Sequence, residues 1–140
     1  MAEIEKPLLV LDLDGVVLDW GLIFKKDAKI VLLILARIFN VKIVTSRDIF
    51  LYITGVAWFW LNNINILIER SGPNGNKATH CKGAFMFVDN DSKHILNVLE
   101  EGSVEKVCFF SKDKEVKLET EKKFSVVSNW WDIFWEALSI

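Results

Sequence analysis

The chain has 140 residues, a formal net charge of −2 and a hydrophobic fraction of 51%. This length is enough for one buried core, so we expect a single domain over residues 1–140. The near-neutral charge and the lack of a long basic run argue against broad electrostatic attraction to nucleic acid, although they leave room for a small basic patch. The two cysteines are too few for a disulfide framework, and the charged start of the chain does not resemble a signal peptide. We therefore expect a cytoplasmic protein.

The first predicted element is a strand at residues 8–11, which are all apolar. Such a run is typical of a central strand in a parallel sheet that is covered on both faces. Asp12 and Asp14 follow it, and Gly15 then permits a tight turn. Alternate side chains of a strand share a side, so we expect both carboxylates to point into one small volume at the carboxyl end of the sheet. The alternative is an ordinary Asp-Gly turn with two solvated acids.

Two carboxylates this close favour either a shared proton or a bound metal ion. Mg²⁺ is the expected cofactor, because it takes oxygen ligands and is commonly held by one or two carboxylates and a substrate phosphate. An aspartate can also attack phosphorus and form an aspartyl-phosphate. Its neighbour can then protonate the leaving oxygen and later activate water.

After the first strand, the hydrophobic pattern predicts alternating helices and strands. In chain order they are a helix at 29–39, a strand at 41–45, a helix at 48–61, strands at 64–68 and 85–88, a helix at 93–100, strands at 104–110 and 124–127, and a helix at 129–138. The apolar run at 30–35 also permits a buried strand instead of the first helix. Asp48 and Ser92 are expected to cap the helices that follow them, and Gly102 is expected to end a helix. The alternation predicts an α/β fold, a three-layer Rossmann-like parallel sheet with helices on both faces.

Residues 49–68 contain no charged side chain and are long enough to cross a bilayer. However, Asn62, Asn63 and Asn65 would be costly inside hydrocarbon. We therefore expect a helix, a turn and a strand here, and no membrane span.

Four motifs carry polar residues of chemical interest. Asp12 to Val17 follows the first strand, Val41 to Arg47 is a strand that ends at Thr45, Lys77 lies in a polar segment, and Phe85 to Ser92 is an apolar strand followed by acids. In this order, they resemble the motifs of the haloacid dehalogenase (HAD) superfamily of aspartate-nucleophile phosphohydrolases. The segment at 60–64 is similar to the nucleotidase-like members. Because the gaps between the motifs are short, the resemblance implies a capless enzyme with only a short flap at 19–26.

The resemblance implies catalytic and metal-binding roles for three acids. Asp12 would be the nucleophile and a metal ligand. Asp14 would be the general acid/base and would offer its backbone carbonyl to Mg²⁺, and Asp89 would complete the metal site. The chain departs from many members because Asn90 stands where they carry a second acid. Whether Asp91 replaces that acid is left open.

The resemblance also implies a phosphate-binding set. Thr45 would hold a phosphoryl oxygen, and Ser46 and Arg47 beside it are further candidate substrate-binding residues. Lys77 would neutralise charge on the transferring group, a role that suits a lysine. Lys82 is the alternative for this motif, and an ordinary solvated loop lysine is the alternative for Lys77.

The positions of the aromatic residues indicate whether the chain associates with another protein chain. Side chains at 58–60 must point in different directions around one helical turn, so not all can face one core, and the tryptophans at 130, 131 and 135 raise the same difficulty. An exposed apolar patch of this kind supports self-association, and we expect a homodimer. Trp20, on the flap, is expected to pack over the edge of the core, with stacking on a base or sugar as the alternative.

The leading hypothesis is a Mg²⁺-dependent phosphomonoester hydrolase that uses an aspartyl-phosphate. Its substrate would be a nucleotide or another small phosphorylated metabolite, and the nucleotide rests on the resemblance alone. One alternative is a phosphatase acting on nucleic-acid 3′ ends, which an open site permits. Another is a non-catalytic HAD-like binding or assembly module.

Overall fold

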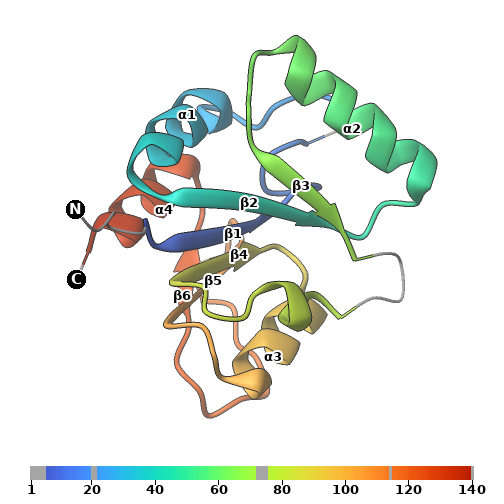
Figure 1. The fold of residues 1–140 in the computed structure, drawn as a ribbon. Coiled ribbons are helices and arrows are strands. Elements are labelled where there is room, and N and C mark those ends of the chain that lie inside the picture. The colour runs from blue at the N-terminus through green and yellow to red at the C-terminus, as the bar shows by residue number, and fades with distance from the viewer. Residues whose placement is uncertain (1–5, 20–21, 72–75, 114, 140) are drawn as a thin grey trace, which may run out of the picture.

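A six-stranded parallel sheet forms the centre of the computed structural model, which describes residues 6–19, 22–71, 76–113 and 115–139 (Figure 1). The strand order is β3-β2-β1-β4-β5-β6. The strands are β1 (Leu8–Asp12), β2 (Asn40–Thr45), β3 (Leu67–Arg70), β4 (Met86–Asp89), β5 (Lys106–Phe110) and β6 (Ser125–Val127). The helices are α1 (Ala28–Ile38), α2 (Ile49–Leu61), the 3₁₀ helix η1 (Lys77–His80), α3 (Ser92–Glu101) and α4 (Trp130–Leu138).

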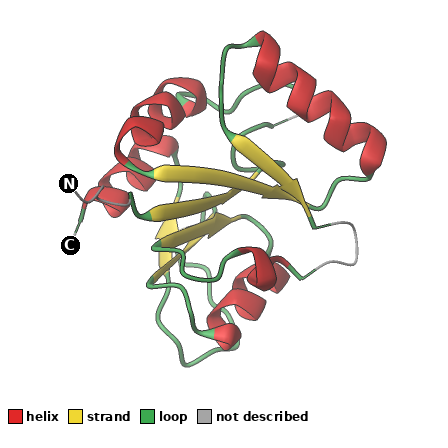
Figure 2. Cartoon of the chain, in the orientation of Figure 1, coloured by secondary structure: helices red, strands yellow, loops and turns green. Residues whose placement is uncertain are grey.

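Helices cover both faces of the sheet, which confirms the predicted three-layer, Rossmann-like α/β fold (Figure 2). On one face, residues of α1, α2 and α4 pack with Leu9 and Leu11 of β1. On the other face, residues of α3 and η1 pack with Val10. β1 is therefore buried on both sides, as its uninterrupted apolar sequence predicts.

The segment after residue 28 is a helix, and the alternative of a buried strand is wrong. β1 already pairs in parallel with β2 on one edge and with β4 on the other, so no place beside it is open. The helix instead buries Val31, Leu32 and Leu35, whose spacing places them on one face. This packing accounts for part of the apolar run, whereas Ile30 and Leu33 of the same run are exposed.

Most predicted boundaries differ from the structure by one or two residues; the largest difference is the start of β3, and one predicted helix cap also differs. The strand expected at 64–68 begins only at Leu67, because the chain first turns at Asn63 (φ 57°) and the Ile64 amide donates to the carbonyl of Phe59 at 2.9 Å. Asp91, rather than Ser92, caps α3 by accepting a hydrogen bond from the amide of Lys93 at 2.9 Å. Asp48 caps α2 and Gly102 ends α3, as predicted.

Glu69 on the edge strand β3 is held by Lys42 at 3.0 Å and by His80 at 2.9 Å. Burial alone would raise the pKa of Glu69, but the hydrogen bonds from His80 and Lys42 lower it below its ordinary value. A lowered folded-state pKa stabilises the fold above the ordinary carboxyl pKa, and this contribution is lost as the pH falls through the folded value. We expect Glu69→Gln to lower Tm at pH 7, with the deficit shrinking below about pH 4. Thermal melts from pH 7 to 3, with the exposed Glu105→Gln as control, check this; a deficit independent of pH would contradict it.

Several large apolar side chains are exposed. On α2, Phe50 is 80% exposed and Trp60 is 77% exposed, whereas Phe59 is buried. On α4, Trp135 is 66% exposed and Trp130 is buried. The sequence expectation that these aromatic residues cannot all face the core is therefore confirmed.

Among the described residues, no helix is long and apolar enough to cross a membrane. Trp20 lies outside the described residues.

Candidate active site

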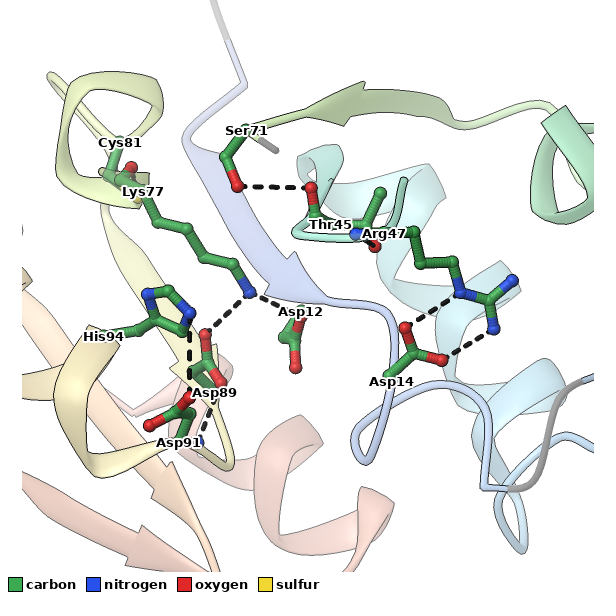
Figure 3. Close-up of polar contacts among 10 residues, drawn as sticks. All are labelled: Asp12, Asp14, Thr45, Arg47, Ser71, Lys77, Cys81, Asp89, Asp91 and His94. Carbon is green, nitrogen blue, oxygen red and sulfur yellow. Dashed lines mark hydrogen bonds and ion pairs between the residues drawn. The ribbon is translucent and has the colours of Figure 1, made fainter. Parts of the chain in front are cut away.

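Three charged side chains meet at the carboxyl ends of β1 and β4 (Figure 3). Asp12 ends β1 and Asp89 ends β4, the strand beside it. The Lys77 ammonium, at the start of η1, lies between them, with its Nζ 2.5 Å from Asp12 Oδ1 and 3.0 Å from Asp89 Oδ2. All three are buried, and Lys77 is only 1% exposed. The structure thus brings Lys77 to the carboxylates, whereas Lys82 is exposed.

The charges in this cluster do not cancel, since one ammonium faces two carboxylates. Burial, together with the charge of Asp89, raises the pKa of Asp12 well above its ordinary value, although Lys77 acts in the opposite direction. Burial would lower the pKa of Lys77, but the attraction of Asp12 and Asp89 outweighs it and raises that pKa. An ionised cluster of this composition carries an excess negative charge in a buried place, which favours a cation as its next ligand.

Three oxygen atoms converge on the side-chain amide of Asn90. In the amide orientation that satisfies its neighbours, the nitrogen lies 3.0 Å from Asp12 Oδ2, 3.1 Å from the main-chain oxygen of Asp14 and 3.3 Å from Asp89 Oδ1. A set of two carboxylates and a carbonyl suits a hard cation such as Mg²⁺. The resemblance to the HAD superfamily implies the same three residues as metal ligands. No group of three or more His, Cys, Asp or Glu side chains in the described part of the chain is placed to hold a metal, so the third ligand would be this carbonyl.

Gly15 makes room for that amide. Its φ is 85°, and a Cβ built on it would lie 2.5 Å from the Asn90 Cγ. We expect Gly15→Ala to lower the free energy of unfolding by about 1–3 kcal/mol and to displace Asn90. Gly83→Ala is a matched control, because its φ is 75° but no atom of the described residues lies within 4 Å of its Cβ position. Denaturant unfolding of both variants checks this, and an equal loss in the two would show that Asn90 makes no contribution.

Thr45 ends β2 and is fully buried. Its Oγ1 accepts a hydrogen bond from the Arg47 amide at 3.1 Å, and its carbonyl accepts from the amide of Ser71 at 2.8 Å and from the Ser71 hydroxyl at 3.2 Å. These contacts fix the turn that follows β2. Ser46 lies in this turn and borders the same cavity as Asp12. Ser71 was not among the predicted site residues, because it lies outside the four motifs; residues 72–75 separate it from the segment that contains Lys77.

Asp14 has an orientation that strand alternation did not predict. It borders the same cavity as Asp12, but its carboxylate is directed toward Arg47 (Figure 3). The reason is that β1 ends at Asp12, so Asp14 lies in the following turn, where the alternation of side chains no longer applies. Arg47 Nε lies 2.8 Å from Asp14 Oδ2, and its Nη2 lies 2.6 Å from Oδ1.

Two neighbouring cavities lie at this end of the sheet. One of about 440 Å³ is bordered by Asp12, Lys77 and Ser46, and the other, of about 470 Å³, by residues that include Lys25 and Lys112. They share Asp14, Asn90 and Phe109 as lining residues. A larger cavity of about 970 Å³ lies between α2 and β3, and its lining has no charged side chain.

The flap expected at 19–26 starts from a tight turn after β1. The Gly15 amide donates to the carbonyl of Leu18 at 2.8 Å, and Leu18 forms an antiparallel bridge with Phe24.

His94 on α3, which the sequence analysis did not include among the site residues, is buried and borders the smaller cavity. Its Nε2 lies 3.7 Å from Asp91 Oδ2. Asp91 caps α3, so its carboxylate is engaged at the helix end beside the cluster.

No protein-family model matches this chain, and the search of curated proteins gives no match either. The assignment of a class therefore depends on the residues and geometry described above.

Proposed function

We propose that the chain is a capless, HAD-type phosphomonoester hydrolase that depends on Mg²⁺ and forms an aspartyl-phosphate on Asp12. The observation that carries the proposal is the buried cluster of Asp12, Lys77 and Asp89 at the carboxyl ends of two adjacent parallel strands. Open α/β sheets bind ligands at this edge. Asp12, Lys77 and a second acid, Asp14, border one cavity. A nucleophile, a cation and an acid placed together suit phosphoryl transfer, since it depends mainly on positioning and charge neutralisation.

Each side chain has a defined task in this proposal. An Asp12 oxygen attacks the phosphorus while Asp14 gives a proton to the leaving oxygen, and Asp14 later takes a proton from the water that releases phosphate. Ser46, which borders the cavity with Asp12, binds a phosphoryl oxygen, and the buried Thr45 fixes the turn that presents Ser46. Lys77 holds Asp12 in place and neutralises charge on the transferring group.

Asp12, Asp89 and the carbonyl of Asp14 would hold the metal ion. When bound there, Mg²⁺ would neutralise charge on the phosphoryl oxygens. The convergence of these three oxygens on the amide of Asn90 supports this donor set. The neutral Asn90 adds no charge to the set.

The test is phosphate release from a panel of phosphomonoesters with Mg²⁺, with EDTA, and with Ca²⁺ in place of Mg²⁺. The panel contains nucleoside monophosphates, small sugar phosphates and an oligonucleotide with a 3′-phosphate. We expect turnover with Mg²⁺ only, since the larger Ca²⁺ accepts looser geometry and more ligands. Asp12→Asn, purified in parallel, controls for contaminating phosphatases. Turnover that is equal with Mg²⁺ and with EDTA would contradict the proposal.

The same panel separates the two alternatives. Selective hydrolysis of the 3′-phosphorylated oligonucleotide would indicate a phosphatase of nucleic-acid ends. Magnesium binding without turnover of any ester would favour a non-catalytic binding module. The retention of Asp12 and of its buried partner Lys77 favours the enzyme.

Self-association through the exposed face of α2 is part of the proposal. Phe50 and Trp60 are more than three-quarters exposed, and no charged residue lies within α2. Apolar surface of this kind is typical of interfaces. Light scattering is expected to give a dimer mass that Trp60→Ser lowers to that of a monomer. A monomer mass for the unchanged chain across micromolar concentrations would contradict it.

A further inference from the structure

Arg47 is a buried arginine whose guanidinium is bound on several sides. The residue is 8% exposed. Its Nε and Nη2 donate to the two carboxylate oxygens of Asp14 at 2.8 and 2.6 Å, and its Nη1 donates to the carbonyl of Leu51 at 3.1 Å. Paired, parallel hydrogen bonds of this kind fix the plane of a carboxylate as well as its distance. Lysine cannot reproduce them.

Gly55 of α2 provides the space for this guanidinium. A Cβ at Gly55 would lie 3.3 Å from Arg47 Nη1 and 3.3 Å from Leu13 Cδ2. A glycine inside a helix costs about 0.5–1 kcal/mol relative to alanine. The glycine lies at the position where the Arg47 guanidinium packs against the helix. Leu51, one turn earlier, has the carbonyl that accepts a hydrogen bond from Arg47 Nη1. The surrounding fold therefore fixes the position of the Arg47 guanidinium.

Within the part of the chain that the structure describes, the Asp14 side chain forms hydrogen bonds only with Arg47. It lies in the turn after β1, and its side chain is 49% exposed. It lines both cavities at this edge of the sheet. The two hydrogen bonds from the Arg47 guanidinium therefore determine where the Asp14 carboxylate lies relative to Asp12 (Figure 3).

We propose that Arg47 is the positioning residue for proton transfer, acting through Asp14 rather than by binding the phosphoryl group. This inference rests on the proposed function. In the first step an Asp12 oxygen bonds to phosphorus, the bond from phosphorus to the leaving oxygen breaks, and the Asp14 proton passes to that oxygen. The carboxylate left on Asp14 is neutralised by the guanidinium, which stays charged. In the second step water attacks the phosphorus, its proton returns to Asp14, and phosphate and Asp12 are released.

The test compares an alkyl phosphate with p-nitrophenyl phosphate. An alkoxide is a poor leaving group and needs the proton, whereas p-nitrophenolate leaves without one. The quantity measured is kcat/KM, because it reports the steps through cleavage of the ester bond and not the later hydrolysis. General acid catalysis is worth about 10²–10⁴-fold. We expect Arg47→Met to lose at least about ten times more kcat/KM on the alkyl ester than on the aryl ester.

A double-mutant cycle shows whether the effect passes through Asp14. In the Asp14→Asn background, Arg47→Met should reduce alkyl-ester hydrolysis much less than it does in the unchanged chain. Arg37→Met, an exposed arginine on α1, is the matched control and should change neither substrate. Equal losses on both esters, with a raised KM and additive effects in the cycle, would show that Arg47 binds the phosphoryl group, and would overturn the inference.

Two further variants keep the test valid if Arg47→Met does not fold. Arg47→Lys keeps the positive charge but cannot form the paired hydrogen bonds to Asp14. Gly55→Ala keeps Arg47 but places a Cβ close to its guanidinium. Both should show the same preference for loss on the alkyl ester, and a uniform loss in both would overturn the inference. Absence of turnover by the unchanged chain on every ester would instead overturn the proposed function itself.

Discussion

Asp12→Asn is expected to reduce phosphate release by at least about 10³-fold while the fold is retained. The amide oxygen of asparagine is a far weaker nucleophile than a carboxylate, so the covalent step is lost. The fold should survive because burial and Asp89 already disfavour the charge of Asp12, as its raised pKa indicates. In the variant, Lys77 retains its pair with Asp89 at 3.0 Å. Steady-state kinetics and thermal melting of the same preparation measure both quantities.

Asp91→Asn is the matched control for this substitution. Asp91 is an exposed acid near the cluster that caps α3, and its amide equivalent can still accept the hydrogen bond from the Lys93 amide. We expect it to retain most of the activity of the unchanged chain. Activity of Asp12→Asn that equals that of Asp91→Asn would show that Asp12 is not the nucleophile.

Lys77→Met is expected to lower the free energy of unfolding by about 3–5 kcal/mol at pH 7. The substitution leaves Asp12 and Asp89 buried without their shared cation, and one of the two must take up a proton or the cluster must open to water. The pKa of Asp12, which is already raised by burial and by Asp89, would then rise further because the opposing effect of Lys77 is lost. A raised carboxyl pKa favours the folded state at low pH, and this advantage is lost as the pH rises. The deficit of the variant should therefore shrink as the pH falls toward about 4.

Urea unfolding of Lys77→Met from pH 7 to 4 measures this effect. Asp89→Asn in the same background removes one of the stranded charges and is expected to recover part of the lost stability. Lys82→Met, at an exposed lysine, is the control and should be nearly neutral. A deficit of less than about 1 kcal/mol in Lys77→Met would mean that Lys77 makes no more than a surface ion pair.

The sheet was predictable from sequence because its pattern depends on few assumptions. The short apolar run at residues 8–11 favours a strand that is buried on both faces, and this placed Asp12 at the end of β1. Asp89 and Thr45, which entered the prediction through the resemblance to the HAD superfamily, end strands that pair with β1 and lie at the same edge of the sheet. The start of β3 was missed because Ile64 is apolar but serves to pack beneath α2 before the strand begins.

Side-chain pairings were less accessible, because they depend on geometry between distant segments. The pairing of Arg47 with Asp14 requires that β2 lie beside β1 and that Gly55 leave a space, and neither fact can be read from the residues near Arg47. The choice between Lys77 and Lys82 depends on η1, which directs the first inward. Asn90 was counted as a lost acid, whereas its amide lies where three acceptor oxygens converge.

The measurement that tests the central claim most directly is a search for phosphate bound to Asp12. The chain would be mixed with a ³²P-labelled ester that it hydrolyses, quenched in acid within milliseconds, digested and mapped. The proposal predicts label on the peptide that contains Asp12, released by hydroxylamine as an acyl phosphate and absent from Asp12→Asn. Turnover with no labelled peptide at any quench time, and with equal rates in Asp12→Asn, would contradict it.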